Sequence, residues 1–401
     1  MKIGVLTVHL PTNYGNALQM LALHRYLRDQ GHDAEVLSHW CEENKREISL
    51  WHDYRRQSIL KWIAFAVSCL TWTGKFCALR RETKIAKWLA ENVRWSSGVG
   101  WHGEFPTADV KYDAVIVGSD QVWNSNCEFV RFFFLPDFQE TVKRIAYAAS
   151  FNSEAFPEED RDFCRKQLLR FSGVSVRESS SVDVVRDRVG VVPVHVCDPV
   201  LLYSRSEWMQ MLSLEEHNKG RPFNMCYIVS PAGWAYYDDL IRIAKETHLP
   251  LHVYAFACTE AAIQSRNPLR VVFSMLLKRM RLFASGVRLH FSADPTEFLQ
   301  RMCNAEGVFT DSFHGMMFAT IFEKRCNVVV GTNRERQEMK AKLVDFVRDL
   351  GFESALSDHF DVRHMQKLGM SRPLQELIVF SKSWLKNVLE KGKGPEELSA
   401  V

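Results

Sequence analysis

The chain has 401 residues, a formal net charge of +3 at pH 7 and an apolar fraction of 46%. A single hydrophobic core seldom serves more than about 250–300 residues, so we expect two domains. The nearly balanced charge gives no overall electrostatic basis for binding nucleic acid, so any basic surface must be local.

The cysteines and apolar runs narrow the class of protein further. Ten cysteines are scattered along the chain without a CxxC pair or a Cys/His cluster at the spacing of metal ligands. They are typical of reduced core thiols in a cytoplasmic protein. The longest apolar window, 63–72, is too short to span a bilayer, and the first fifteen residues lack the features of a signal peptide. We therefore expect no transmembrane segment.

In the first half of the chain, short β-branched runs alternate with segments of helical period. This alternation predicts parallel strands connected by helices. A helix is predicted over 16–31, with Leu18, Leu21 and Tyr26 along one face and Gly31 at its end. The predicted strands are 2–8, 34–39, 114–119, 144–149, 173–177 and 191–197.

Residues 40–108 interrupt this pattern with an insertion rich in Trp, Lys and Arg. Two interpretations stay open. The insertion forms a helical flap with solvated basic faces and tryptophan anchors, or it forms a patch that binds the acceptor or a membrane surface. Basic and interfacial aromatic side chains suit anionic headgroups, which is the basis of the second interpretation.

The second half repeats the alternation after a polar linker at 213–222. The predicted strands are 224–229, 251–257, 287–292, 307–310 and 327–331, and the predicted helices are 237–248, 295–304 and 314–324. The repetition predicts an α/β protein with two Rossmann-like lobes facing a cleft. We place the first lobe at 1–212, the second at 223–350 and a C-terminal helical tail at 351–401.

Polar stretches follow several predicted strands, where loops and helix N-termini of doubly wound sheets offer N–H groups to ligands. In PTNYGNALQ, Asn13 and Asn16 either cap the following helix or contact an anion. In VGSDQVWN, a tight turn explains the glycine and aspartate beside Ser119 but leaves the following Gln121, Trp123 and Asn124 unexplained. We therefore expect this second stretch to contribute to a site.

Arg177 ends another apolar strand, in the stretch SVRE. A guanidinium in this position binds a carboxylate or phosphate through two hydrogen bonds, or it pairs with the neighbouring Glu178. Both interpretations stay open from the residues alone.

The stretch TDSFHGMMFA places a histidine at the start of an apolar helix. Asp311 or Ser312 is the predicted N-cap, which puts His314 in the first turn. A helix N-terminus disfavours an imidazolium, whereas a bound anion favours it. We therefore expect His314, if it acts as an acid, to be charged mainly when an anionic substrate is bound.

The ordered set NYGNALQ, GSDQVWN, SVRE, DPVLL (198–202) and DSFHG resembles the polysaccharide pyruvyl transferase family over roughly residues 1–350. The resemblance implies a GT-B-like pair of lobes and transfer of a pyruvyl group from phosphoenolpyruvate to a sugar of a surface polysaccharide or its lipid-linked precursor. The product would be a cyclic pyruvate ketal. The family's acid aligns with His314 and its substrate-binding arginine with Arg177. The further substrate contacts carried over are Asn16, Ser119, Asp120 and Ser312.

The residue types suit this chemistry. An arginine and helix N-termini hold the carboxylate and phosphate of the donor while an acid protonates its methylene carbon. The scheme requires no metal and no cofactor beyond phosphoenolpyruvate as donor substrate. Many relatives carry a basic residue before the Leu-His or Phe-His pair, where this chain has Asp311 and Ser312. The candidate substitutes for its phosphate contacts are Arg325, Arg334 and Arg336.

Two alternatives stay open. One is a GT-B glycosyltransferase that uses a nucleotide sugar, because the fold would be shared. The other is a non-catalytic glycan-binding relative, which would be favoured if His314 and Arg177 lay far apart. The expected partners are phosphoenolpyruvate and a sugar or lipid-linked oligosaccharide, with no nucleic acid. We expect a cytoplasmic protein that either stays free or contacts the inner face of the membrane through the 40–108 insertion.

Overall fold

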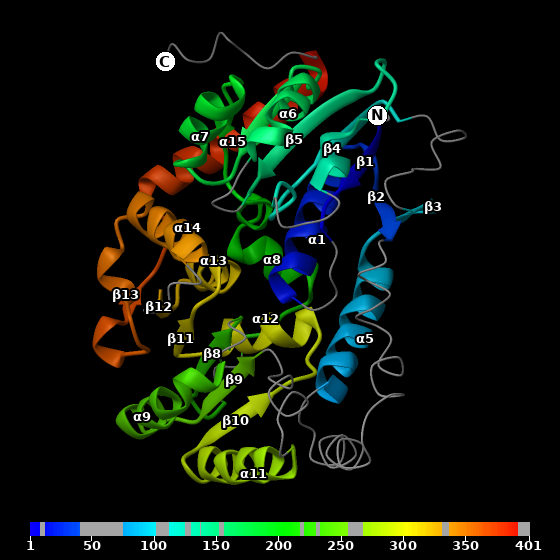
Figure 1. The fold of residues 1–401 in the computed structure, drawn as a ribbon. Coiled ribbons are helices and arrows are strands. Elements are labelled where there is room, and N and C mark those ends of the chain that lie inside the picture. The colour runs from blue at the N-terminus through cyan, green and yellow to red at the C-terminus, as the bar shows by residue number, and fades with distance from the viewer. Residues whose placement is uncertain are drawn as a thin grey trace.

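Two parallel β-sheets form the centre of the structure, one above the other in Figure 1, and helices cover both. The computed structural model describes residues 1–8, 13–40, 75–101, 112–124, 130–136, 138–151, 156–216, 220–229, 233–255, 268–330 and 337–391. Most of the predicted insertion, the middle of the predicted linker, and the candidates Arg334 and Arg336 lie outside these residues.

The first sheet has the strand order β3-β2-β1-β4-β5-β6-β7, and all of its pairings are parallel. Its strands are β1 (Lys2–Leu6), β2 (Asp33–Trp40), β3 (Trp95–Trp101), β4 (Ala114–Val117), β5 (Lys143–Ala149), β6 (Gly173–Val176) and β7 (Val194–His195). In register, Ile3 pairs with Ala34 on one side and with Ala114 on the other. β4 is the uninterrupted apolar run AVIV, buried at every residue, as expected for a central parallel strand covered on both faces.

The second sheet has the order β10-β9-β8-β11-β12-β13, with β14 added antiparallel to β12. Its strands are β8 (Asn224–Ile228), β9 (Leu251–Ala255), β10 (Val287–His290), β11 (Gly307–Thr310), β12 (Arg325–Val329), β13 (Leu356–Ser357) and β14 (Gln366–Lys367). Counted from the first strand of each lobe, both sheets begin 3-2-1-4-5-6, the doubly wound order of Rossmann folds. The predicted fold class, two Rossmann-like lobes of the GT-B-like type, is confirmed.

The helices are α1 (Tyr14–Asp29), α5 (Lys75–Asn92), α6 (Arg161–Leu168), α7 (Ser181–Val189), α8 (Arg205–Met211), α9 (Tyr237–Thr247), α11 (Pro268–Ala284), α12 (Pro295–Asn304), α13 (Phe313–Ile321), α14 (Gln337–Asp349) and α15 (Arg372–Lys391). The predicted face of α1 is buried, with Leu18, Leu21 and Tyr26 in the core, and nearly all of the rest of the helix from Tyr14 to Leu27 is buried too. It lies between the first sheet and the second lobe, where Tyr14 stacks on Phe298 at 4.5 Å. In the described ranges, no helix is long and apolar enough to cross a membrane.

Two segments join the sheets in ways that the sequence pattern did not indicate. β3 lies within the predicted insertion, yet it pairs with β2 and forms the edge of the first sheet. Its sequence WSSGVGW contains serine and glycine where strands usually carry β-branched residues, so it gives little strand signal. The predicted strand 191–197 is reduced to the two residues of β7.

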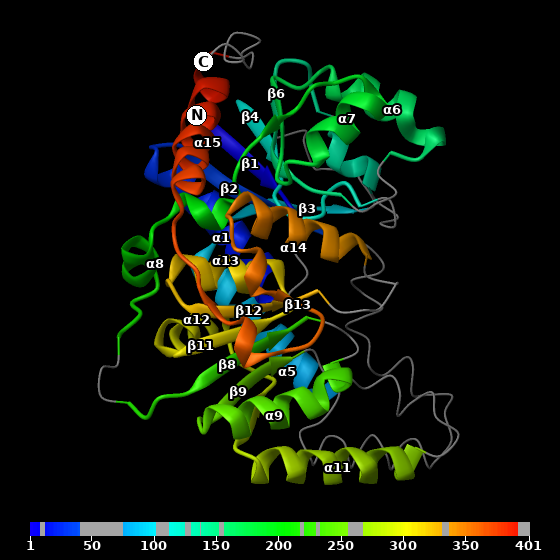
Figure 2. The same cartoon turned by 90° about the vertical axis from the view of Figure 1, so that its left-hand side faces the viewer.

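The predicted tail, 351–401, contributes to both lobes. β13 and β14 pair with β12 in the second sheet, after which α15 crosses back to the first lobe (Figure 2). There Trp384 packs beside Tyr147 at 6.3 Å, and Lys143 Nζ donates a 2.6 Å hydrogen bond to Leu389 O. α15, the last helix that the structure describes, therefore packs on the lobe that contains β1.

Candidate active site

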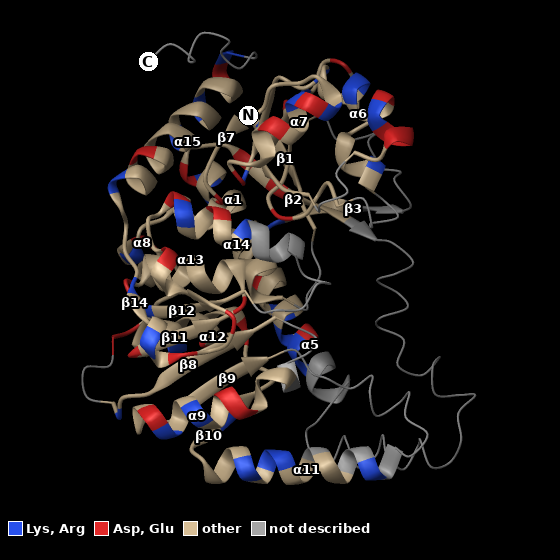
Figure 3. Ribbon diagram, turned by 60° about the vertical axis from the view of Figure 1, so that its left-hand side comes forward, with Lys and Arg blue, Asp and Glu red and all other residues tan. Residues whose placement is uncertain are grey.

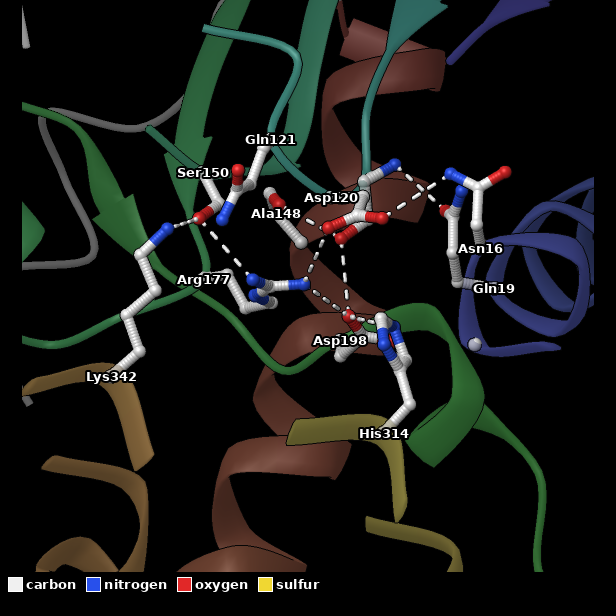
Figure 4. A network of polar contacts seen from close by, with 12 residues as sticks. Asn16, Gln19, Asp120, Gln121, Ala148, Ser150, Arg177, Asp198, His314 and Lys342 are labelled. Atoms are coloured by element: carbon white, nitrogen blue, oxygen red, sulfur yellow. Dashed lines mark hydrogen bonds and ion pairs between the residues drawn. The ribbon is translucent and has the colours of Figure 1, made fainter. Parts of the chain in front are cut away.

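The carboxyl ends of the central strands of both lobes lie near the interface between the lobes. In the first lobe, β1 leads into α1 and β4 leads into Ser119 and Asp120; in the second, β11 leads into α13. β1 and β4, like β8 and β11, flank the point where the strand order reverses. Ligands of doubly wound sheets bind outside the carboxyl ends of the strands at this point. Figure 4 shows the polar network that the two lobes build there.

The turn after β4 is tightly constrained. Gly118 has φ +124°, and a Cβ at this position would lie 2.0 Å from Tyr147 O, so only glycine fits. Ser119 is fully buried, and its N–H donates to Gln19 Oε1 at 3.1 Å. Its Oγ lies 3.0 Å from Ala148 O and 3.2 Å from Asp198 Oδ2, so its single proton serves one of these acceptors.

The residues after Asp120 make packing and turn contacts. Trp123 is a core residue, 1% exposed and stacked on Phe134 at 5.4 Å. Asn124 Nδ2 donates to Gln121 Oε1 at 3.0 Å, which closes the turn. Core packing and turn closure thus account for the side chains that suggested a site role.

The N-terminus of α1 is held by side chains from both lobes. Asn13 Oδ1 accepts hydrogen bonds from Gly15 N at 2.8 Å and, across the interface, from Tyr227 OH at 3.1 Å. Asn16 Nδ2 donates to Asp120 Oδ2 at 3.2 Å, while Asn16 Oδ1 is buried without a hydrogen-bond partner among the described residues. Asn13 therefore caps α1 and also connects the two lobes, and Asn16 Oδ1 remains available as an acceptor.

Arg177 lies in a pocket of carboxylates. It is 5% exposed, its Nε donates to Glu178 Oε1 at 2.9 Å and its Nη1 donates to Asp198 Oδ2 at 3.1 Å. Burial works against the charged form, but Glu178 and Asp198 raise the pKa of Arg177 above its ordinary value. A third carboxylate, that of Asp120, lies 3.7 Å from Nη1.

Further protein groups contact the remaining sides of the Arg177 guanidinium. Its Nη2 donates to Ser150 Oγ at 3.2 Å, and its Cζ lies 4.2 Å from the centre of the Phe313 ring. The structural pairing with Glu178 is thus realised. Arg177 directs its hydrogen bonds at protein groups, so it orients the carboxylates of the network.

His314 lies in the first turn of α13 and faces the first lobe. It is 6% exposed, and its Nε2 lies 3.6 Å from Asp198 Oδ2. This nitrogen is buried and makes no hydrogen bond to any residue that the structure describes. His314 and Arg177 thus approach the same carboxylate oxygen, which is the opposite of the separation that the non-catalytic alternative requires.

Asp198 is the functional candidate that sequence reasoning missed. Its Oδ1 accepts from Val200 N at 3.1 Å. Burial alone would raise the pKa of Asp198, but the neighbouring His314 and then Arg177 lower it to about 2. The available signal was the family stretch DPVLL, in which the aspartate caps a short 3₁₀ helix at Pro199–Leu202.

Gly15 sets the position of the His314 ring. A Cβ added to Gly15 would lie 2.4 Å from His314 Cγ and Nδ1, well inside contact distance. Glycine at the second residue of α1 therefore leaves the space that the imidazole fills. As a result, the N-termini of α1 and α13 meet, and both helix dipoles place partial positive charge at His314.

The other residues of the stretch 310–319 hold α13 in place. Ser312 is its N-cap, with Oγ accepting from Gly315 N at 3.2 Å, and Asp311 Oδ1 accepts from Val229 N at 2.7 Å. Ser312 is 3% exposed, so the described contacts give it a capping function. Arg325 opens β12 in register with Gly307, the first residue of β11. It therefore lies at the amino-terminal end of the strands, opposite the end that leads to His314, and is not placed to contact a phosphate there.

Two cavities are described, and one of them touches the network. One, of about 440 Å³, is lined by Arg177 and His195 but also by the carboxylates of Asp198, Asp349 and Glu376, so it does not favour an anionic ligand. The other, of about 620 Å³, lies in the second lobe beside α11 and α12. In the described ranges, no group of three or more His, Cys, Asp or Glu side chains could hold a metal ion.

The arrangement is suited to proton transfer next to an anion. A histidine beside a buried, ionised aspartate is oriented as an acid or base, and two helix N-termini supply N–H groups to a negatively charged ligand. Most of the predicted site residues thus lie in one cluster around Asp198. They are Asn16, Ser119, Asp120, Arg177 and His314.

Comparison with known proteins gives one family match. A sequence model described as polysaccharide pyruvyl transferase matches residues 13–333. No curated protein matches the sequence.

Several solved structures share the general chain path at low similarity. A UDP-GlcNAc 2-epimerase from Neisseria meningitidis bound to UDP-GlcNAc has 11% identity and a TM-score of 0.46, over 96% of this chain and 100% of that one. The same enzyme from Methanocaldococcus jannaschii has 11% identity and a TM-score of 0.47, over 95% and 99%. An alpha-glucosyltransferase in complex with UDP has 7% identity and a TM-score of 0.46, over 98% and 93%. Similarities at this level say nothing about the substrate of this chain.

Proposed function

Because the chain belongs to the polysaccharide pyruvyl transferase family, and is therefore a transferase, we propose that it moves a pyruvyl group from phosphoenolpyruvate to a sugar. The acceptor is a sugar of a surface polysaccharide or of its lipid-linked precursor, and the product is a pyruvate ketal. The reaction takes place in the cytoplasm and uses no cofactor besides the donor. The observation that carries the proposal is the contact of His314 with the buried carboxylate of Asp198 between two helix N-termini.

The donor has two anionic groups, and the site offers positive potential for them. The first turns of α1 and α13 present backbone N–H groups that helix geometry leaves without intrahelical partners. Because Arg177 is enclosed by protein carboxylates, its proposed role is to hold Asp198 ionised and in place. The anions of the donor are then bound by the helix N-termini, with the phosphate near the start of α1.

In the proposed reaction, protonated His314 gives its proton to the methylene carbon of phosphoenolpyruvate. The resulting cation-like carbon is attacked by one sugar hydroxyl, whose proton returns to His314. The C–O bond to phosphate then breaks as His314 gives that proton to the leaving phosphate. A second hydroxyl of the same sugar attacks the same carbon to close the ketal, and its proton returns to His314, which restores the imidazolium. Asp198 stabilises the charged imidazole in each protonated stage, as a buried carboxylate does for a catalytic histidine.

Phosphate release from phosphoenolpyruvate, measured with a panel of free sugars and lipid-linked oligosaccharides, tests this function. Acceptor-dependent release, with a mass gain of one pyruvate less one water, is expected for the wild type. His314→Gln should reduce kcat by about 10²–10⁴-fold, the usual contribution of a general acid. His359→Gln, at an exposed histidine of the second lobe, serves as the matched control and should leave kcat unchanged.

The possible outcomes test the identity of the donor and the identity of the acid separately. Release that survives His314→Gln would keep the donor and remove His314 as the acid. No release with any acceptor, together with no binding of phosphoenolpyruvate by calorimetry, would overturn the proposal. In that event binding of UDP-sugars would be measured, because a nucleotide-sugar transferase is the alternative for this fold.

A further inference from the structure

α11 carries an unusual share of the exposed apolar surface. In the part of the chain that the structure describes, eight large apolar side chains are exposed, and four of them, Phe273, Leu277, Met280 and Phe283, belong to this helix. Their exposed fractions range from 46% to 67%. A helix on the surface of a globular protein normally turns such residues inward.

These side chains form a stripe along the helix. At 3.6 residues per turn, Phe273, Leu277 and Met280 fall within about 60° of one another around the axis, with Phe283 at the edge of the stripe. Leu282, on the opposite side, is 1% exposed and packs into the core of the second lobe with Leu240 and Val287. The helix is therefore attached to the lobe by one side and presents its apolar side outward.

The charge of α11 is entirely positive. Its sequence, PLRVVFSMLLKRMRLFA, contains four basic residues and no aspartate or glutamate. Figure 3 shows blue segments and no red along this helix, at the end of the molecule away from the first lobe. Arg270 and Arg281 are exposed and flank the apolar stripe on one side, and Arg279 lies toward the other.

We propose that α11 docks on an anionic lipid membrane, with the apolar stripe inserted among the headgroups and the flanking arginines on the phosphates. A helix with an outward apolar stripe and a purely basic flank matches the chemistry of such an interface. The absence of acidic residues in its sequence favours a partner of uniformly negative charge, as an anionic lipid surface is. The residues of this surface lie outside the 40–108 insertion in the sequence, and docking through them does not require the reaction that the site performs.

α11 lies beside a cavity of the second lobe, so docking through this helix would also place the cavity near the membrane. Arg279 of α11 also lines the 620 Å³ cavity, together with Lys84 of α5 and Arg301 of α12. The same lining contains one carboxylate, Glu297, which pairs with Lys84 at 3.0 Å. Docking through the apolar stripe therefore brings a cavity with a net positive lining close to the lipid surface. If the proposed function holds, an acceptor that remains attached to a membrane lipid would then be held near the protein without leaving the bilayer.

Vesicle co-sedimentation with the full chain tests the proposal. The wild type should bind vesicles of phosphatidylglycerol and phosphatidylcholine at least tenfold more tightly than vesicles of phosphatidylcholine alone, with binding that weakens as salt rises. Phe273→Ser, Leu277→Ser and Met280→Ser combined should reduce binding at least tenfold. Arg270→Gln with Arg281→Gln should reduce it several-fold and lower its sensitivity to salt.

Matched controls come from exposed residues elsewhere. Leu169→Ser with Val379→Ser removes apolar side chains of similar exposure, and Arg186→Gln removes an exposed charge; both should bind as the wild type does. Thermal unfolding checks that every variant is folded. Failure of the wild type to bind anionic vesicles, or full binding by the folded triple variant, would overturn the proposal. So would self-association that the triple variant abolishes without any vesicle binding, because α11 would then contact a second copy.

Discussion

At the scale of single residues, the fit of His314 against Gly15 should control the rate. In Gly15→Ala, the added Cβ would lie 2.4 Å from His314 Cγ, so the imidazole must move. A displacement of this size at a catalytic group typically reduces kcat by about 10²-fold. Steady-state kinetics should show the loss in kcat with little change in KM. Gly369→Ala, where nothing lies within 4 Å of the added Cβ, is the control. Unchanged kcat in folded Gly15→Ala would contradict the proposed function of His314.

Asp198 should make the stability of the fold depend on pH in a defined window. Its pKa falls from 3.8 to about 2 in the folded protein, so the ionised carboxylate stabilises the fold above pH 3.8. That stabilisation is lost as the pH falls from about 4 to about 2. The free energy of unfolding of the wild type, relative to Asp198→Asn, should therefore shrink by about 2 kcal/mol between pH 5 and pH 2.

Urea unfolding at several pH values measures this difference. Asp187→Asn, at an aspartate whose side chain is 64% exposed, is the control, and its difference from the wild type should stay nearly constant. A difference between wild type and Asp198→Asn that does not change over the window would show that Asp198 is not held ionised by His314 and Arg177.

At the scale of elements, the start of α1 should affect donor binding. Asn13→Ala removes the N-cap and the acceptor for Tyr227 OH, which should cost about 1 kcal/mol of unfolding free energy. Because the cap orients the first N–H groups of the helix toward the proposed donor phosphate, KM for phosphoenolpyruvate should rise several-fold. Ser204→Ala removes the N-cap of α8 and should lower stability by a similar amount without changing KM.

The positions of the elements followed from local sequence patterns. Alternation of β-branched runs with helical segments placed β1, β4, β5, β8, β11 and their neighbours close to their observed bounds. β3 was missed because WSSGVGW has little strand propensity and is ordered by pairing with β2, a long-range contact that the local pattern does not contain. The burial of α1 beyond its predicted apolar face has a related cause, since the second lobe packs against it, as Tyr14 does on Phe298.

In the candidate site too, local sequence signals identified some residues, whereas the contacts that depend on tertiary packing were not predicted. His314 and Arg177 became candidates from their places at a helix start and a strand end, and the family resemblance supplied their expected roles. Asp198 follows no strand of useful length and was noticed only as part of the family stretch. Arg177 reaches it because β6 and β7 are neighbours in the first sheet. Its contact with His314 depends on how the two lobes pack, which spacing along the chain does not report.

At the scale of the whole molecule, the two lobes share one core across the site. A single cluster of buried residues includes Ile3 and Leu18 of the first lobe, Phe298 and Phe318 of the second, and Trp384 of α15. Hydrogen bonds cross the interface next to the network, including Lys342 Nζ to Ser150 Oγ at 2.7 Å. The site is thus assembled by tertiary packing that spans nearly the full length of the chain.

This packing predicts that α15 supports the site from a distance. Trp384 is 1% exposed against the first lobe, so Trp384→Ala should lower the free energy of unfolding by about 3–5 kcal/mol through the cavity that it leaves. Because the core is continuous, both lobes should lose structure in one transition, followed by circular dichroism in urea. Val379→Ala on the exposed side of the same helix should change stability by less than about 0.5 kcal/mol. Two separate transitions in Trp384→Ala would mean that the lobes fold independently and that α15 stabilises only the first.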